Sequence, residues 1–140
     1  MARSRRRPDG EIEKPSNTPP QRRKWIWFRS EPGARSKAEE EFLDLPIPAK
    51  AGLSVRISRY KNGESRLGDV DSLGDGIYEI RYRHLNNQYR VLFMLWGPHC
   101  VGLTAFFKNQ RKTSKTDIDR AAKRSEKWID KHGKEPANPN

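Results

Sequence analysis

The sequence has little that would stabilise a small protein covalently or hold it in a membrane. Its 140 residues contain a single cysteine, Cys100, so an internal disulfide is excluded. No group of Cys and His residues has the spacing of zinc ligands, and we expect neither a metal nor another cofactor. The longest apolar run, residues 91–96, is far shorter than the roughly 20 residues of a membrane-spanning helix, and no signal peptide is visible. These features predict a cytoplasmic protein without membrane contact, whose fold depends on its hydrophobic core.

Acidic residues are also few compared with basic ones. The chain has 29 Lys and Arg against 18 Asp and Glu, which gives a net charge of +11. The excess of positive over negative charge is +5 in residues 1–24 and +5 in residues 105–140, but only +1 in the residues between them. Such a charge favours a polyanionic partner, because counterions released from phosphates drive binding. The near-neutral middle means that net charge alone does not locate a binding surface.

The composition divides the chain into three parts. Residues 1–24 contain four prolines and almost no apolar side chains, so we expect a disordered basic leader. Its arginines, Arg3 and residues 5–7, are compatible with a non-specific RNA-binding arm, but a solvated tail or an upstream start codon is the simpler explanation. Residues 25–133 have the periodic apolar pattern of one folded domain, and residues 134–140 form a polar tail.

The first half of this domain predicts one strand and two helices. Residues 25–28 are strongly β-prone, and a Ser-Lys-Ala-Glu capping box begins a short helix at residues 36–45. A second helix, with a proline in its first turn, spans residues 48–62, and we expect the two helices to form a hairpin. The three carboxylates at 39–41 are predicted to lie on a solvated helix face. The glycine-rich stretch 62–76 is predicted to be a loop.

Three consecutive antiparallel strands are predicted in the second half of the domain. The first two, residues 77–83 and 89–96, flank an Asn-Asn turn that places Arg83 directly opposite Arg90. A Gly-Pro turn leads into the third strand, which ends at Lys108. One face of the sheet is then apolar and the other carries the arginines. The residues predicted to form the apolar face are Tyr78, Ile80, Tyr82, Val91, Phe93 and Leu95.

A final helix at residues 114–131 closes the domain. The strand pairing puts Ala105 beside Arg90 on the strand before it. Met94 and Trp96 are expected to be covered by a helix, because a central strand that is apolar on both faces is usually buried on both. The predicted fold class is α+β: an N-terminal strand and helical hairpin, a three-stranded antiparallel meander and a C-terminal helix. The residues predicted to form the buried face of the last helix are Ile118, Ala121, Ala122, Ser125 and Ile129.

The strongest functional signal is a group of basic side chains at one end of this sheet and in the loop before the last helix. Like charges directly opposite on a sheet destabilise it, so Arg83 facing Arg90 predicts a bound anion, most naturally phosphate. The alternative is that Glu79 and nearby aspartates neutralise the arginines in surface ion pairs. The group consists of Arg81, Arg83, Arg90, Lys108, Arg111, Lys112 and Lys115.

Such a group is sufficient for cleaving RNA without a metal. Attack of a ribose 2′-OH on the adjacent phosphate needs in-line alignment and stabilisation of added negative charge, which Arg and Lys supply. The imidazole nearest these arginines is His84, although a histidine in a turn is more often a bystander than a general base. His99 and Cys100 are adjacent in a strand and point to opposite faces, so they do not form a nucleophile pair.

Several segments occur in a characteristic order and spacing. They are residues 41–46 (EFLDLP), 73–81 (LGDGIYEIR), 88–93 (QYRVLF), 105–108 (AFFK), 112–113 (KT) and the closing helix. Together they resemble the RelE/HigB-type toxins of bacterial and phage type II toxin–antitoxin modules. The likeness covers residues 25–133, and the combination is specific although no single motif is.

The resemblance implies a RelE-like fold and an endoribonuclease that cuts messenger RNA in the ribosomal A site. It also implies inhibition by a small antitoxin, usually a helix-turn-helix protein. By the same resemblance Arg81 and Arg90 contact phosphate and Lys108 begins the basic segment, so these three are the predicted catalytic residues. The chain departs from relatives where Asn109 replaces a second lysine and Ser114 replaces a proline. The residues predicted to bind RNA around them are Arg83, His84, Arg111, Lys112 and Lys115.

Two other functions stay open from the sequence. A toxin of the same fold that acts on another target, such as DNA gyrase, does not depend on this phosphate site. Dependence of toxicity on Arg81 and Arg90 therefore separates that function from RNA cleavage. A non-catalytic basic module binds RNA or DNA without cutting it.

Overall fold

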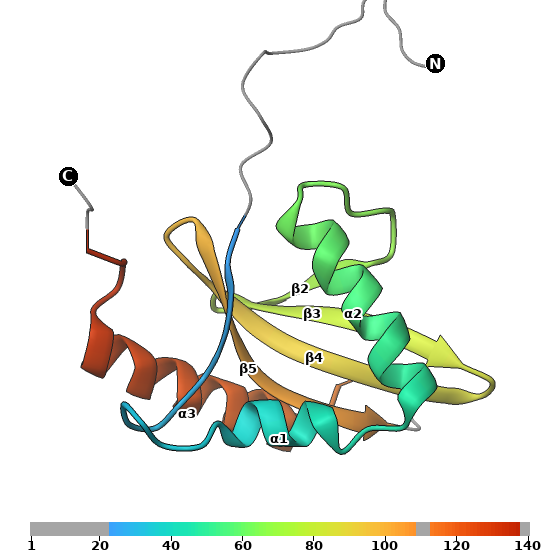
Figure 1. The fold of residues 1–140 in the computed structure, drawn as a ribbon, viewed down its shortest axis with the longest axis horizontal. Coiled ribbons are helices and arrows are strands. Elements are labelled where there is room, and N and C mark those ends of the chain that lie inside the picture. Colours follow the sequence, from blue (N-terminus) through green and yellow to red (C-terminus); the bar gives the residue numbers. More distant parts are fainter. Residues whose placement is uncertain (1–22, 109–112, 138–140) are drawn as a thin grey trace, which may run out of the picture.

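The computed structural model describes residues 23–108 and 113–137, which form an α+β fold as the sequence predicts (Figure 1). Most of the expected leader lies outside the described residues, as do Arg111 and Lys112. Within these two ranges, no helix is both long and apolar enough to cross a membrane. In chain order the elements are β1 (Trp25–Trp27), α1 (Lys37–Leu43), α2 (Ile47–Lys61), β2 (Val70–Gly74), β3 (Ile77–His84), β4 (Asn87–Trp96), β5 (His99–Lys108) and α3 (Lys115–His132).

The five strands form one sheet in the order β1-β5-β4-β3-β2. Strands β2 to β5 are an antiparallel meander, whereas β1 pairs in parallel with β5 and places Trp25 beside Cys100. Strand β2 shows that the prediction of a continuous loop at residues 62–76 was wrong. This edge strand has one neighbour and exposes polar side chains, so its sequence, VDSLG, lacks the apolar alternation of a half-buried strand.

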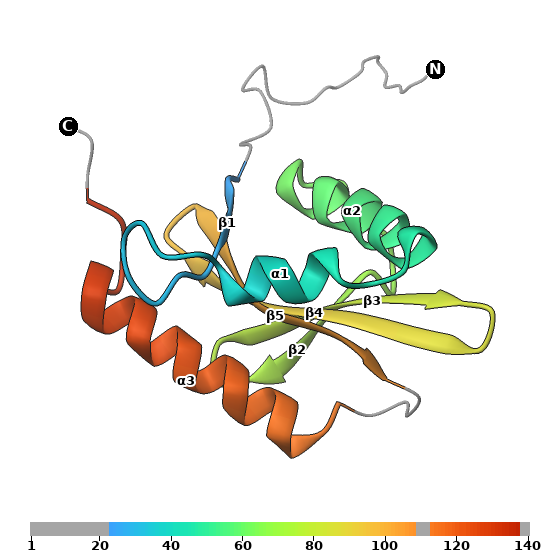
Figure 2. The same ribbon diagram turned by 60° about the horizontal axis from the view of Figure 1, so that its bottom comes forward.

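Helices cover both faces of the sheet (Figure 2), with α2 on one face and α3 on the other, while α1 lies along β5. Strand β4 is buried on both sides, because Phe93 packs in the apolar cluster under α2 and Met94 in the cluster under α3. Met94 is thus covered as expected, and the Trp96 ring packs edge-on against Trp128 of α3. The sheet is therefore the middle of three layers, and an apolar central strand is typical of that arrangement.

The packed face of helix α3 is rotated from the one that its apolar spacing predicts, although Ala121 is buried and Ile129 packs against the core as expected. Ser114 caps it by accepting a hydrogen bond from the backbone N–H of Asp117 at 3.2 Å. The buried residues of the helix are Asp117, Ala121 and Trp128, so the contact face is rotated away from Ala122. Trp128 has by far the largest apolar area to bury, and it decides the orientation against a stripe of smaller side chains.

Helices α1 and α2 do not form the predicted hairpin. Helix α1 packs along β5, and α2 packs over β3 and β4 (Figure 1). In α1, Ala38 belongs to the cluster shared with α3 and Phe42 to the cluster under α2, so this short helix spans the edge of the sheet. Each helix has one narrow apolar face, and the sheet rather than the other helix covers it.

The register between β3 and β4 differs from the predicted one by two residues. The turn consists of Leu85 and Asn86, with Leu85 at a φ of 57°, and it pairs Arg81 with Arg90 and Arg83 with Gln88. The prediction that Arg83 faces Arg90 is therefore wrong. Because the shift is an even number of residues, every side chain nevertheless keeps its predicted face.

A β-bulge changes the register between β4 and β5. Near the Gly-Pro turn β4 and β5 pair as predicted, but an irregularity midway along β4 shifts the pairing by one residue. Arg90 consequently pairs with Phe106 and not with Ala105, which was the expectation. Lys108 pairs with Gln88 and shares the face of the sheet that carries the arginines. The bulge thus brings a lysine of β5 to the basic end.

Candidate functional site

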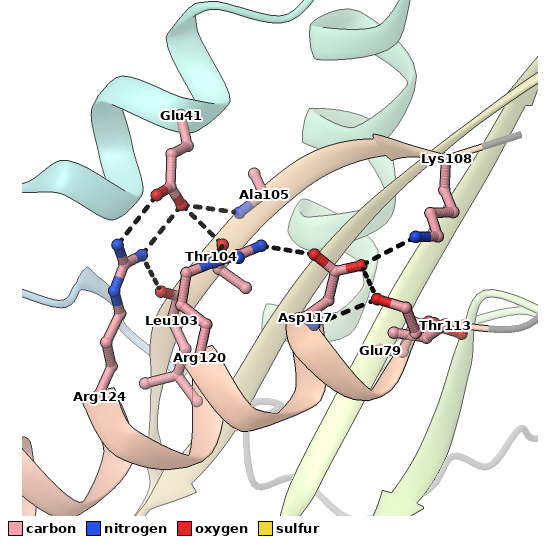
Figure 3. Close-up of polar contacts among 11 residues, drawn as sticks. Glu41, Glu79, Leu103, Thr104, Ala105, Lys108, Thr113, Asp117, Arg120 and Arg124 are labelled. Carbon is pink, nitrogen blue, oxygen red and sulfur yellow. Dashed lines mark hydrogen bonds and ion pairs between the residues drawn. The ribbon is translucent and has the colours of Figure 1, made fainter.

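A buried ion pair lies beneath the basic end of the sheet. Arg90 of β4 and Glu79 of β3 have exposed fractions of only 1% and 2%. Arg90 Nη1 lies 3.2 Å from Glu79 Oε2 and donates to Thr113 Oγ1 at 2.6 Å, while Nη2 donates to Gln88 Oε1 at 2.6 Å. The Thr113 hydroxyl in turn donates to Glu79, and Figure 3 shows both residues beside the start of α3. In this network the two buried charges are paired with each other.

Arg90 therefore does not occupy the exposed position expected of a phosphate-contacting residue. Its side chain is the largest fully buried one among the described residues. Glu79 does neutralise it, as the alternative explanation held, although the pair is buried and not on the surface. Loss of either partner of such a pair leaves an uncompensated charge in the interior, so the geometry is held tightly.

Arg81 is the arginine of β3 that reaches the surface beside this pair. It faces Arg90 across the strands, forms an ion pair with Asp71 of β2 and lies 3.5 Å from Glu79, yet 40% of its side chain is exposed. Burial, and then the positive charge of Arg90, lower the pKa of Arg81. Both effects penalise the charged guanidinium, and a bound anion would offset them.

A hollow of about 300 Å³ opens next to Arg81, along the part of β3 that has no partner in β2. Arg83 is exposed there, and its Nε donates to the carbonyl of Leu85 at 3.3 Å. On the side of α2, the Arg56 guanidinium lies over the Tyr82 ring at 4.9 Å. We call this surface the arginine hollow. It is lined by Arg56, Gly68, Arg81, Tyr82, Arg83 and Gln88.

Positive charge exceeds negative charge around the arginine hollow. Asp69 accepts two hydrogen bonds from Arg59, at 2.9 and 2.8 Å, and lies 3.6 Å from Arg56. The other carboxylates here are Asp71 and Glu79, which lie next to Arg81. The nearby groups are the carboxylates Asp69, Asp71 and Glu79 and the arginines Arg56, Arg59, Arg81, Arg83 and Arg90. The imbalance makes the surface attractive to a polyanion.

Arg56 was not predicted as a site residue. It belongs to a helix whose sequence was interpreted through its apolar face, and a polar residue beside that face carries no signal of function. His84, by contrast, was predicted to bind RNA, and it lies at the end of β3 with its ring parallel to that of Tyr82, 6.4 Å between centroids. The structure thus places His84 near the arginine hollow but not among its lining residues.

Lys108 lies on β5. It is on the opposite side of the buried Arg90–Glu79 pair from the arginine hollow. Its Nζ is 3.4 Å from Asp117 Oδ2 in the first turn of α3 (Figure 3). Ser114 and Arg120 also donate to the Asp117 carboxylate, each at 2.6 Å. Burial acts to raise the pKa of Asp117, but these hydrogen bonds and the charge of Arg120 outweigh it and lower the pKa. The ionised carboxylate therefore holds Lys108 at the first turn of α3.

The predicted basic residues do not all meet at one place. Arg81 and Arg83 line the arginine hollow, and Lys108 lies on the far side of Arg90. Lys115 is 91% exposed at the start of α3 and forms an ion pair with Asp119 at 3.8 Å. The positions of Arg111 and Lys112 fall outside the described residues.

A second polar network, which the sequence did not reveal, fixes α3 against β5 and α1. Glu41 accepts two hydrogen bonds from Arg124 at 3.0 Å each and one from Thr104 at 2.7 Å (Figure 3). Burial acts to raise the pKa of Glu41, but the bonds from Arg124 and Thr104 lower it overall. The prediction of a solvated face at residues 39–41 was thus wrong for Glu41. Its partners come from two distant elements, which no local pattern links.

Comparisons with known proteins identify the family to which this chain belongs. The family described as phage derived protein Gp49-like (DUF891) matches residues 40–126. Two proteins named probable endoribonuclease HigB1, from Mycobacterium tuberculosis strains CDC 1551 / Oshkosh and ATCC 25618 / H37Rv, are each 41% identical over 112 residues, which cover 80% of this chain and 90% of theirs. The resemblance to RelE/HigB-type toxins is thereby confirmed. The chain belongs to the Gp49-like family, among the HigB-type toxins of toxin–antitoxin modules.

Proposed function

We propose that this protein is an endoribonuclease that cleaves messenger RNA and inhibits translation as the toxin of a type II module. The observation that carries the proposal is the excess of arginines over carboxylates around the arginine hollow. RNA presents a continuous line of phosphates to such a surface. The name of the two Mycobacterium tuberculosis relatives, probable endoribonuclease, supports the same activity.

Each basic residue has a distinct role in this proposal. Arg81 holds the scissile phosphate through hydrogen bonds to its oxygens, and Arg83 binds the RNA strand beside it. Lys108 adds positive charge from the β5 side and stabilises the negative charge that builds up during the reaction. Arg90, predicted from the resemblance to be catalytic, acts here through Glu79, which lies 3.5 Å from Arg81, and is a positioning residue.

The proposed reaction is attack by the ribose 2′-oxygen on the adjacent phosphorus. The 2′-OH proton passes to water or to a ribosomal group, the bond from phosphorus to the 5′-oxygen breaks, and the departing 5′-oxygen takes up a proton. The products are a 2′,3′-cyclic phosphate and a 5′-hydroxyl, and arginine and lysine can stabilise the phosphorane without a metal. A surface hollow does not by itself hold the ribose in line, so we propose that the ribosomal A site supplies the alignment.

A cognate antitoxin is the second proposed partner. Membership of a toxin–antitoxin family implies an inhibitor, and the resemblance points to a small helix-turn-helix protein. Co-expression of the neighbouring gene with this chain should abolish toxicity and yield a complex that copurifies. A neighbouring product that neither binds nor neutralises the toxin would contradict this partner.

The cleavage test uses purified protein with messenger RNA alone and with programmed ribosomes. Wild type should cut only in the presence of ribosomes and leave 2′,3′-cyclic phosphate ends. The Arg81→Gln variant should lose about 100-fold or more in rate, the effect of removing one donor to a developing anion. The control, Arg35→Gln, changes charge equally at an exposed arginine that pairs with Glu40 at 2.8 Å, and its rate should stay the same.

Three outcomes of the same assay would contradict parts of the proposal. Efficient cutting of naked message would exclude ribosome dependence, and 5′-phosphate ends would exclude attack by the 2′-OH. Toxicity that persists in Arg81→Gln, together with no cutting by wild type, would favour a different target such as DNA gyrase.

A further inference from the structure

Helix α2 contributes one side chain, Arg56, to the arginine hollow. We propose that Arg56 is an RNA-binding residue that forms, with Arg83, a subsite for a second phosphate next to the one held at Arg81. The arginine hollow then binds two consecutive phosphates of a single strand. This inference rests on the proposed function and specifies how the substrate strand is held.

The first support is that Arg56 is held in place before any substrate binds. Its guanidinium lies over the Tyr82 ring at 4.9 Å, and its Nη1 donates to the carbonyl of Gly52 at 3.4 Å. The Tyr82 ring itself lies directly on the backbone of α2, because a Cβ at Gly52 would come within 2.3 Å of the ring. A stacked guanidinium keeps its N–H groups at the edge and loses little further freedom when it binds an anion.

The second support is that Asp69 does not use up the donors of Arg56. The two side chains are 3.6 Å apart, which is longer than a hydrogen bond. Asp69 already accepts two hydrogen bonds from Arg59 and one, at 2.9 Å, from the backbone N–H of Arg66. A carboxylate has about four acceptor sites and a guanidinium has five N–H donors, so most donors of Arg56 are available for phosphate oxygens.

The third support comes from the other residues on the rim of the arginine hollow. Within the described part of the chain, Arg83 forms no ion pair with a carboxylate, and its hydrogen bond goes to the Leu85 carbonyl. Gln88 accepts from Arg90 through Oε1, so its amide nitrogen remains as a donor. Two guanidinium groups and an amide N–H therefore line the hollow in which we propose the second phosphate binds.

The experiment measures binding of a short single-stranded RNA whose 2′-oxygens are methylated, so that it cannot be cleaved, over a series of salt concentrations. We expect Arg56→Gln to weaken binding roughly tenfold, as loss of a charged hydrogen bond does. The slope of log affinity against log salt should fall by about 0.7, the value for one phosphate contact on a single strand. Arg56→Lys should keep the slope but bind more weakly than wild type, since lysine cannot make the same stacked fork.

The matched control is again Arg35→Gln, which removes one positive charge far from the arginine hollow and should keep the affinity and slope of wild type. Thermal unfolding of each variant separates binding from stability. If Arg56→Gln binds as Arg35→Gln does, or loses affinity without any change in the salt slope, the subsite is wrong. If wild type binds RNA and Arg56→Gln does not, but wild type cuts nothing on ribosomes, the subsite stands and the proposed function fails. If wild type does not bind the RNA at all, the subsite is wrong, and the cleavage assay on ribosomes decides the proposed function separately.

Discussion

Arginines one strand apart have opposite roles at the basic end of this protein. Arg90 is enclosed by Glu79, Gln88 and Thr113, whereas Arg81, its partner across the strands, is 40% exposed. The difference arises because Thr113, just before α3, covers β4 and leaves the free edge of β3 open. Residue type alone therefore does not tell whether an arginine is a buried structural residue or contacts the substrate.

Arg90→Ala should destabilise the folded protein by about 3 to 5 kcal/mol, because it leaves the Glu79 carboxylate buried without its partner. Urea unfolding followed by tryptophan fluorescence measures the change in the free energy of unfolding. The double variant Glu79→Leu with Arg90→Met should recover most of the loss, since two apolar side chains leave no buried charge. A single variant with wild-type stability would show that the pair contributes nothing to folding.

Cys100 should be unreactive in the folded protein. The thiol is fully buried in β5, and burial raises its pKa to about 11. At pH 8 only about one molecule in a thousand then carries the reactive thiolate. A thiol-specific chromogenic disulfide should react slowly with the native protein and with one equivalent after unfolding in guanidinium. Complete reaction of the native protein within minutes would contradict the buried position.

At the residue scale, the sequence predicts which face of the sheet a side chain lies on better than it predicts whether that side chain is buried. Strand alternation placed Arg81 and Arg83 on one face, and the structure agrees. The burial of Arg90 depends on Thr113, which lies beyond the end of the next strand. Arg56 meets these residues only because α2 packs over β3, a tertiary contact without a local pattern in the sequence.

At the scale of elements, two carboxylates connect α3 to the rest of the protein. Glu41 of α1 is bound by Arg124 of α3, and Asp117 of α3 is bound by Lys108 of β5. Together they hold the helix at both its start and its middle. Because α3 covers the face of the sheet that contains Met94, its attachment decides whether this half of the core is closed.

This attachment should weaken in acid. The pKa values of Glu41 and Asp117 are lowered in the folded state, so ionised carboxylates contribute stability above the unfolded pKa values, and this contribution is lost as the pH falls through the folded ones. Stability should therefore fall progressively below about pH 5. Asp117→Asn should show a shallower decline in unfolding free energy from pH 5 to pH 3, whereas Asp130→Asn, exposed on the same helix, should follow wild type. Equal pH profiles for all three proteins would show that Asp117 is not a source of the acid sensitivity.

Elements with explicit end signals were the ones that the sequence predicted well. The capping serines Ser36 and Ser114 each accept a hydrogen bond from the residue three positions later, so both helix starts follow from local chemistry. Strand β2 was missed because an edge strand needs no apolar pattern. The packing of α1 and α2 was predicted incorrectly because sequence proximity suggested a hairpin, while each helix found its apolar partner on the sheet.

At the scale of the whole molecule, the folded layers account for the core, and the basic leader adds charge. Residues 1–22 contain almost no apolar side chains, so their composition offers little packing surface, whereas the backbones of Arg23 and Lys24 hydrogen-bond to Lys61 and Cys100. Deleting residues 2–22 should change the melting temperature by less than about 2 °C, which is below 1 kcal/mol for a chain of this size. Differential scanning calorimetry of the shortened chain tests this, and a drop of more than about 5 °C would mean that the leader packs on the domain.

The parallel pairing of β1 with β5 has a consequence for the order of events during synthesis. The first strand to leave the ribosome has its partner at residues 100–102, and α1 packs on the same late strand. Such pairings between distant segments form slowly and only once both are present. A nascent chain that ends before β5 already carries Arg56, Arg81 and Arg83. It still lacks the strand with which β1 pairs, and it lacks Thr113, which completes the enclosure of Arg90. We therefore expect the toxin to be inert on the ribosome that makes it, and to become harmful to other ribosomes only after its last quarter has been translated.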